Sequence, residues 1–169
     1  MTSDPLTILL KHHHWATGVV LDLCQPLSHQ QFHQRFDIGP GSLHDTIDHI
    51  IGCVEFWTAR VKGQRTQSTP AEQTIPELRN RLDASTAAIE ALIGELQVAD
   101  MMDHERTDSL STPDGRIEAT YTCAAAIVHC LVHGTHHRAQ ALNMLRRLGV
   151  QPLPELDVID WQIKTENPR

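Results

Sequence analysis

Apolar residues recur every three to four positions in four long segments of the chain, which is the pattern of amphipathic α-helices. The first segment follows Ser3-Asp4-Pro5, where a capping residue precedes a proline that suits the first helical turn. Pro26 ends this helix. His13 falls on the same stripe as the leucines, so we expect the first helix to carry a polar side chain inward near its middle.

The second and third helices have equally clear beginnings and ends. We expect the second from about Leu43 to Lys62, after a capping Ser42 and before Gly63. The third begins after Thr74 and continues to about Gln97. The apolar positions that define these two stripes are Ile47, Ile50, Val54, Val61, Leu78, Leu82, Ile89, Leu92 and Leu96.

The rest of the chain comprises a connection, a loop, a fourth helix and a tail. The polar segment 64–73, which contains Pro70, indicates a crossing connection. The helical period fades between Val98 and Thr120, where Pro113-Asp114-Gly115 marks a turn, and we interpret this segment as an ordered loop. The fourth helix is expected from about Thr122 to Leu148, and an irregular tail follows. Four amphipathic helices with one long connection predict an all-α fold, a four-helix bundle.

Composition narrows the class of protein. A chain of 169 residues fits a single domain over residues 1–169 that buries its own core. The four cysteines form no Cys-x-x-Cys pair, and no signal peptide or membrane-spanning stretch is visible, so we expect a cytoplasmic protein with reduced thiols and no membrane contact. The net charge of −7 and the scattered basic residues argue against nucleic-acid binding.

Four histidines lie within residues 129–137 of the fourth helix. Residues four apart share a helix face, so His133 and His137 can direct their imidazoles at one point. A lone histidine is usually structural or solvated, but clustered histidines are a sign of metal binding. The inward stripe of this helix also contains Cys130 and Met144, and a metal ion would satisfy two imidazoles buried beside them. A third ligand has to come from another segment.

Two segments resemble the DinB-like superfamily of small metal-binding helical bundles, which includes the YfiT-like proteins and some bacterial thiol-dependent transferases. The run His133-Gly-Thr-His136-His137-Arg138-Ala139-Gln140 is similar to the superfamily signature His-x-x-His-His-Arg-Gly-Gln. Residues 41–50, followed by Trp57, resemble a second family segment that begins Gly-Ser and contains a histidine. The resemblance covers nearly the whole chain. It implies an up-down-down-up bundle with a long loop before the last helix and an irregular C-terminal tail.

The resemblance also implies a metal site. The family takes one histidine from the second helix and two from the last, which here are His49, His133 and His137. Three ligands leave one position for water or substrate. Zinc or nickel suits such a site, and iron or cobalt also fits, because imidazole discriminates poorly among these metals. A low-molecular-weight thiol, a small-molecule substrate and a homodimer are further expectations from the resemblance.

The chain departs from the family pattern at two places. His12-His13 precede Trp15 where the family often has Tyr-Asn, so the part played by the first helix in substrate handling stays open. His13 is a candidate for a polar wall or an additional ligand. Ala139 replaces the usual glycine, a change compatible with a helix.

Other polar residues beside the expected ligands have more than one role open to them. They are His129, His136, Cys53, Cys130, Arg138 and Gln140. His129, one turn before His133, either supports that ligand or is exposed, whereas His136 points about 100° away from its neighbour His137, toward solvent or a subunit interface. The two cysteines are either thiolate ligands or small buried side chains. Arg138 and Gln140 orient ligands or form an interface.

Three classes of function follow from these residues. The first is a metal-dependent enzyme acting on a small molecule, either a hydrolase or a thiol-dependent S-transferase. The hydrolase needs a general base, yet the motif His-Glu-x-x-His is absent and Glu55 has no assigned role. The second class is a non-catalytic, stress-responsive metal-binding or ligand-binding protein. The third is a bundle without metal, in which the histidines are structural.

Overall fold

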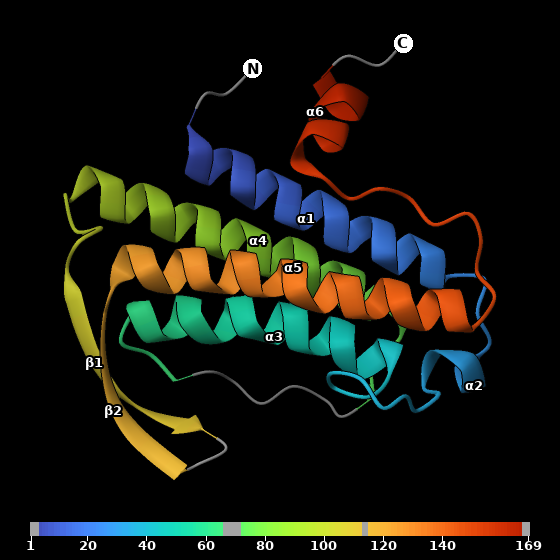
Figure 1. Cartoon of the computed structure of the whole chain (residues 1–169). Helices are drawn as coiled ribbons and strands as arrows, with labels where there is room; N and C mark the ends of the chain where they lie inside the picture. The colour runs from blue at the N-terminus through green and yellow to red at the C-terminus, as the bar shows by residue number, and fades with distance from the viewer. Residues whose placement is uncertain (1–3, 66–71, 113–114, 167–169) are drawn as a thin grey trace.

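The computed structural model describes residues 4–65, 72–112 and 115–166, and within them the chain is mostly helical (Figure 1). The predictions at Pro70 and at the Pro113-Asp114 turn lie outside the described residues. The elements, in chain order, are α1 (Pro5–Cys24), α2 (His29–Phe32), α3 (Leu43–Val61), α4 (Ile75–Val98), β1 (Glu105–Thr112), β2 (Gly115–Thr122), α5 (Cys123–Arg147) and α6 (Val158–Glu166).

Each long helix begins where a side chain satisfies its first free amides. Asp4 accepts from the backbone N–H of Thr7, and Ser42 accepts from that of Asp45. Thr74 and Glu77 form a reciprocal capping box at the start of α4. Thr122 is the last residue of strand β2 and caps α5. The strand therefore leads directly into the helix that carries the histidines of residues 129–137.

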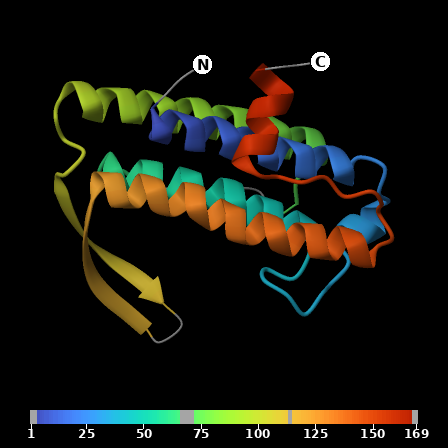
Figure 2. The same cartoon turned by 45° about the horizontal axis from the view of Figure 1, so that its top comes forward.

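The four long helices lie side by side, and each packs on two neighbours (Figures 1 and 2). Helix α5 packs along α3 and crosses α1, while α4 covers the other sides of α1 and α3. Leucine, isoleucine and valine side chains fill the interior between these helices, including fully buried Leu21, Ile47 and Leu131. The close pairing of α3 with α5 is what places residues of the second and last long helices opposite each other.

Strands β1 and β2, residues 105–112 and 115–122, form an antiparallel hairpin, so the prediction of an ordered loop was wrong there. Strands β1 and β2 pair along their whole length, with Leu110 opposite Ile117 and a hydrogen bond between the Thr107 and Thr120 hydroxyls. The hairpin extends away from the helices (Figure 2), and much of β2 is exposed on both faces. Sequence alternation marks a strand only when one face is buried, which is why the pattern was missed.

The C-terminal segment also differs from the prediction, because it ends in helix α6 instead of an irregular tail. The segment is fastened to α1: Nε2 of His12 donates to the carbonyl oxygen of Leu156 at 2.7 Å, and the buried Trp161 ring contacts the His12 ring. The short α2 was likewise not predicted, since four residues are too few to show a helical period. Among the described residues, no helix is long and apolar enough to cross a membrane.

Candidate metal centre

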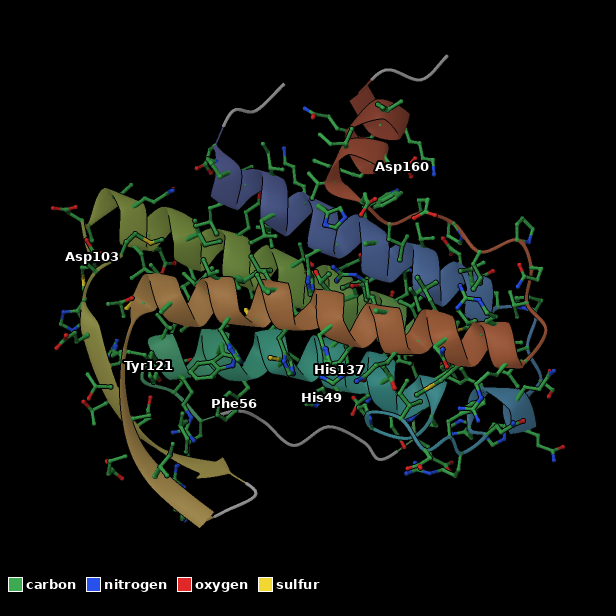
Figure 3. The ribbon with its side chains drawn as sticks, viewed as in Figure 1. His49, Phe56, Asp103, Tyr121, His137 and Asp160 are labelled. Atoms are coloured by element: carbon green, nitrogen blue, oxygen red, sulfur yellow. The ribbon has the colours of Figure 1, made fainter. Side chains whose placement is uncertain are left out.

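Three imidazoles converge between α3 and α5. Nε2 of His133 lies 3.0 Å from Nε2 of His49 and 2.9 Å from Nε2 of His137. One nitrogen from each ring lies within 4.8 Å of the others, so the three residues could hold a metal ion. His49 comes from α3 and the other two from α5, and Figure 3 shows His49 and His137 facing each other across that helix pair.

The helices explain why these side chains meet. His133 and His137 are four residues apart on α5 and therefore lie on one face. That face packs on α3, where His49 follows the buried Ile47 by two positions and sits at the edge of the apolar stripe. Burial rises from the exposed His49 through the half-buried His133 to His137, so the site opens to solvent on the His49 side.

Gln140 holds His137 in one tautomer. Its Oε1 accepts a hydrogen bond from Nδ1–H of His137 at 2.8 Å, and its Nε2 donates to Nε2 of His136 at 2.9 Å. A neutral imidazole carries one N–H, so His137 presents a bare Nε2 lone pair to the other rings. Ligating histidines are commonly oriented in this way by a hydrogen bond to the remaining ring nitrogen.

The nitrogen geometry fits a bound cation better than hydrogen bonding alone. Nε2 of His133 faces both His49 and His137, yet a single hydrogen on that atom can point at only one of them. A metal ion that accepts all three lone pairs removes this conflict. Metal–nitrogen bonds of roughly 2.0–2.1 Å in tetrahedral geometry separate the nitrogens by about 3.4 Å, which is within about 0.5 Å of the two distances from Nε2 of His133.

Partial loss of solvent around the ring nitrogens keeps the three imidazoles neutral, which is the protonation state that binds metals. This desolvation lowers the pKa of His49, whose residue is otherwise exposed, and of the more buried His137 below the ordinary histidine value. The pKa of His133 falls to about 4, first through burial and then through the neighbouring imidazoles, chiefly His137 and His49. The rings are therefore unprotonated near neutral pH.

A glycine in the loop after α2 leaves room for this arrangement. Gly39 has φ +52°, and a Cβ added there would lie 2.0 Å from Oε1 of Gln140. The backbone thus approaches the orienting amide more closely than any side chain would permit. The run Gly39-Pro40-Gly41 is a sequence signal of unusual backbone geometry, but its contact with Gln140 depends on tertiary packing and could not be predicted from the sequence.

The other residues that the sequence suggested for the site lie outside the group of three histidines. His13 is fully buried between α1 and α5, where its ring lies 3.2 Å from Arg138, and it is not part of the ligand cluster. Neither Cys53 nor Cys130 belongs to that cluster, and burial raises the pKa of the Cys53 thiol to about 11. Glu55 forms a two-point ion pair with Arg81.

Two other histidines of the run 129–137 are close to the three candidate ligands without being among them. His129 is exposed, and its ring stacks on that of His133 with centroids 5.3 Å apart. His136 is also exposed and accepts the hydrogen bond from Gln140. Arg138, in contrast, points into the interior and donates to the hydroxyls of Thr17 and Thr135, so it joins α1 to α5.

Comparison with known proteins shows which family and which solved structures the chain is similar to. The model of the DinB family matches residues 2–166. A DinB-like protein from Bacillus subtilis superposes with a TM-score of 0.61 at 15% identity, over 88% of this chain and 97% of that one. A structure from Exiguobacterium sibiricum assigned to the DinB family gives 0.60 at 19% identity, over 93% and 100%. None of the curated proteins matches the sequence. Because the family model spans almost the whole chain, this chain belongs to the DinB family.

Proposed function

We propose that residues 1–169 form a single domain, an up-down-down-up four-helix bundle, that binds one divalent transition-metal ion through His49, His133 and His137. The observation that carries the proposal is the meeting of three Nε2 atoms, one of them 2.9 Å and 3.0 Å from the other two. Zinc or nickel is the expected ion, with iron and cobalt compatible with the same ligands. Gln140 is the residue that sets the tautomer of His137.

The site is open, which favours reaction or binding over a structural role. Structural zinc sites close with four protein ligands, whereas sites that act on substrates keep a position free. Among the described residues, the cluster contains three histidines and no fourth protein ligand. The exposure of His49 leaves the free position accessible to a small molecule from solvent.

Thiol chemistry suits the surrounding residues better than hydrolysis. A divalent ion here would lower the pKa of a thiol or a water molecule that reaches the open position. Hydrolysis also needs a general base, and the three carboxylates of α3 are already paired: Arg35 contacts Asp45 at 2.5 Å, and Arg81 contacts Asp48 at 2.6 Å and Glu55 at 2.7 Å. A thiol whose pKa the ion lowers would release its proton to solvent, and the thiolate is then itself the nucleophile. We therefore propose a metal-dependent S-transferase that acts on a small molecule.

The alternative is a non-catalytic protein that binds a metal or a small ligand. The paired state of Asp48 and Glu55 favours it as well, since binding alone requires no proton transfer. Both functions use the same three histidines, so only a measurement of reactivity separates them.

The test uses cobalt(II)-loaded protein titrated with glutathione and cysteine. The S-transferase proposal predicts a sulfur-to-cobalt charge-transfer absorption, together with conjugation of the thiol to an activated aryl halide by zinc-loaded protein. Metal-stripped protein and the His133→Ala variant are the controls and should show neither signal. Metal-dependent cleavage of 4-nitrophenyl acetate without thiol would indicate a hydrolase instead. Cobalt binding with no thiol signal and no turnover would favour the non-catalytic alternative.

A further inference from the structure

A row of four aromatic rings leads from the candidate metal centre toward the hairpin. The Tyr121 ring lies 5.1 Å from Trp57, Trp57 lies 5.3 Å from His129, and His129 lies 5.3 Å from the ligand His133, all between ring centroids. These residues come from the end of β2, from α3 and from α5. Figure 3 shows Tyr121 beside the start of α5, at the opposite end of the row from His49 and His137.

The ring row is a surface feature. His129 is exposed, and Trp57, Tyr121 and His133 are half-buried, so each ring keeps part of its area open to solvent. Trp57 and Tyr121 pack against the buried apolar cluster that includes Val54 and Ile127. A partly open aromatic surface beside a candidate reaction centre suggests a ligand that covers it.

The far end of the ring row is fixed by polar contacts. The Tyr121 hydroxyl donates to Asp108, which also pairs with Arg60 at 3.1 Å. The Arg60 guanidinium in turn lies over the Phe56 ring, 4.9 Å from its centroid. Since Asp108 and Arg60 satisfy each other, this end requires no charge from a ligand. The row therefore suits an uncharged aromatic group, which can make edge-to-face contacts with rings inclined by 69° and 89° to one another.

The spacing of these residues along their helices sets the size of the bound aromatic group. His129 precedes His133 by one helical turn, and Trp57 follows His49 by eight residues, which correspond to about 6 Å and about 12 Å along the helix axes. One aromatic ring attached to a metal-binding group would reach His129. A second ring in line with the first would reach Trp57.

We propose that the ring row of Tyr121, Trp57, His129 and His133 binds the planar aromatic part of a small molecule whose donor atom occupies the open metal position. This inference rests on the proposed metal centre and adds to it a substrate class, namely compounds with one or two aromatic rings next to a metal-binding group. The Trp57 ring is inclined by 69° to that of His129, so an aromatic ring of such a compound that lies on the open face of His129 meets Trp57 edge to face.

The test measures the affinity of cobalt(II)-loaded protein for three hydroxamates that share one metal-binding group. Acetohydroxamate has no ring, benzohydroxamate has one, and biphenyl-4-carbohydroxamate has two. Perturbation of the cobalt absorption reports binding, and each added ring is expected to tighten it roughly 3- to 10-fold. His129→Ala should remove the gain from the first ring, and Trp57→Leu should remove the gain from the second only. Neither substitution should change the affinity for acetohydroxamate.

Two controls keep the outcomes separate. Trp57→Phe retains a ring and should preserve most of the second gain, whereas Trp15→Leu alters a half-buried tryptophan of α1, outside the ring row, and should leave all three affinities unchanged. If cobalt and acetohydroxamate bind but the three wild-type affinities are equal, or the variants keep the gains, the aromatic subsite is overturned while the metal centre stands. Absence of cobalt binding would overturn both proposals.

Discussion

Gly134 of α5 lies directly against the His13 side chain of α1. A Cβ added there would lie 2.4 Å from Cε1 and 2.7 Å from Nδ1 of His13. The His13 ring is 1% exposed and cannot swing aside. Gly134 therefore sets how His13 and Arg138 fit between the two helices, one residue away from the candidate ligand His133.

Replacing Gly134 with alanine tests this contact. Gly134→Ala should lower the free energy of unfolding by about 1 kcal/mol, because overpacking of roughly 1–3 kcal/mol outweighs the better helix propensity of alanine. In a His13→Ala background the same change should instead stabilise by about 1 kcal/mol. Urea denaturation of the four proteins gives both values. Equal effects of Gly134→Ala in the two backgrounds would contradict the contact.

The buried His13 should also make the free energy of unfolding depend on pH. Burial, with a smaller effect of the Arg138 charge, lowers its pKa from 6.5 to about 3. Below about pH 6.5 the unfolded chain takes up a proton that the folded chain refuses, so this histidine reduces stability by about 1.4 kcal/mol per pH unit as pH falls toward 3. Above about pH 6.5 the His13 ring is neutral in both the folded and the unfolded chain, so it no longer lowers the free energy of unfolding.

The variant His13→Gln removes the titration and keeps an oxygen that can accept from Arg138. Its free energy of unfolding should fall less steeply than that of the wild type between about pH 6 and pH 4, by about 1.4 kcal/mol per unit. Urea unfolding with a chelator present measures both slopes without a contribution from bound metal. Parallel slopes would show that His13 titrates normally.

At the scale of elements, the loop after α2 and the middle of α5 support each other through Gly39 and Gln140. Gln140→Leu should weaken zinc binding by roughly 10- to 100-fold, because His137 loses the group that fixes its tautomer. Gln140→Glu, whose carboxylate can still accept from Nδ1–H, should retain most of the affinity. Competition with a chromophoric zinc chelator measures the three affinities. An unchanged affinity in Gln140→Leu would contradict this role.

The elements also show where sequence reasoning succeeds. Helix starts at Ser42, Thr74 and Thr122 are predictable because capping involves residues three positions apart. The His133 and His137 pair is local for the same reason. Pairing of β1 with β2 leaves both faces largely exposed and gives no hydrophobic alternation, so periodicity could not reveal the hairpin.

At the scale of the whole molecule, contacts between distant segments decide the rest. His49 and His133 are 84 positions apart, and their proximity depends on how α3 packs on α5. The sequence suggested His49 only through resemblance to a family. The approach of Gly39 to Gln140 and the alignment of Tyr121, Trp57 and His129 depend on the same tertiary packing, which no local pattern encodes.

The central claim is that His49, His133 and His137 together bind one metal ion. The most direct test is elemental analysis of protein purified without an affinity tag, for the wild type and for His49→Ala, His133→Ala and His137→Ala. The exposed His129, on the same helix as two of the ligands, supplies the matched control His129→Ala. Circular dichroism establishes that each variant is folded. We predict about one transition-metal ion per chain in the wild type and the control, and loss of it in all three ligand variants. No metal in the wild type, even after addition of zinc or nickel, or full occupancy in a ligand variant, would contradict the account.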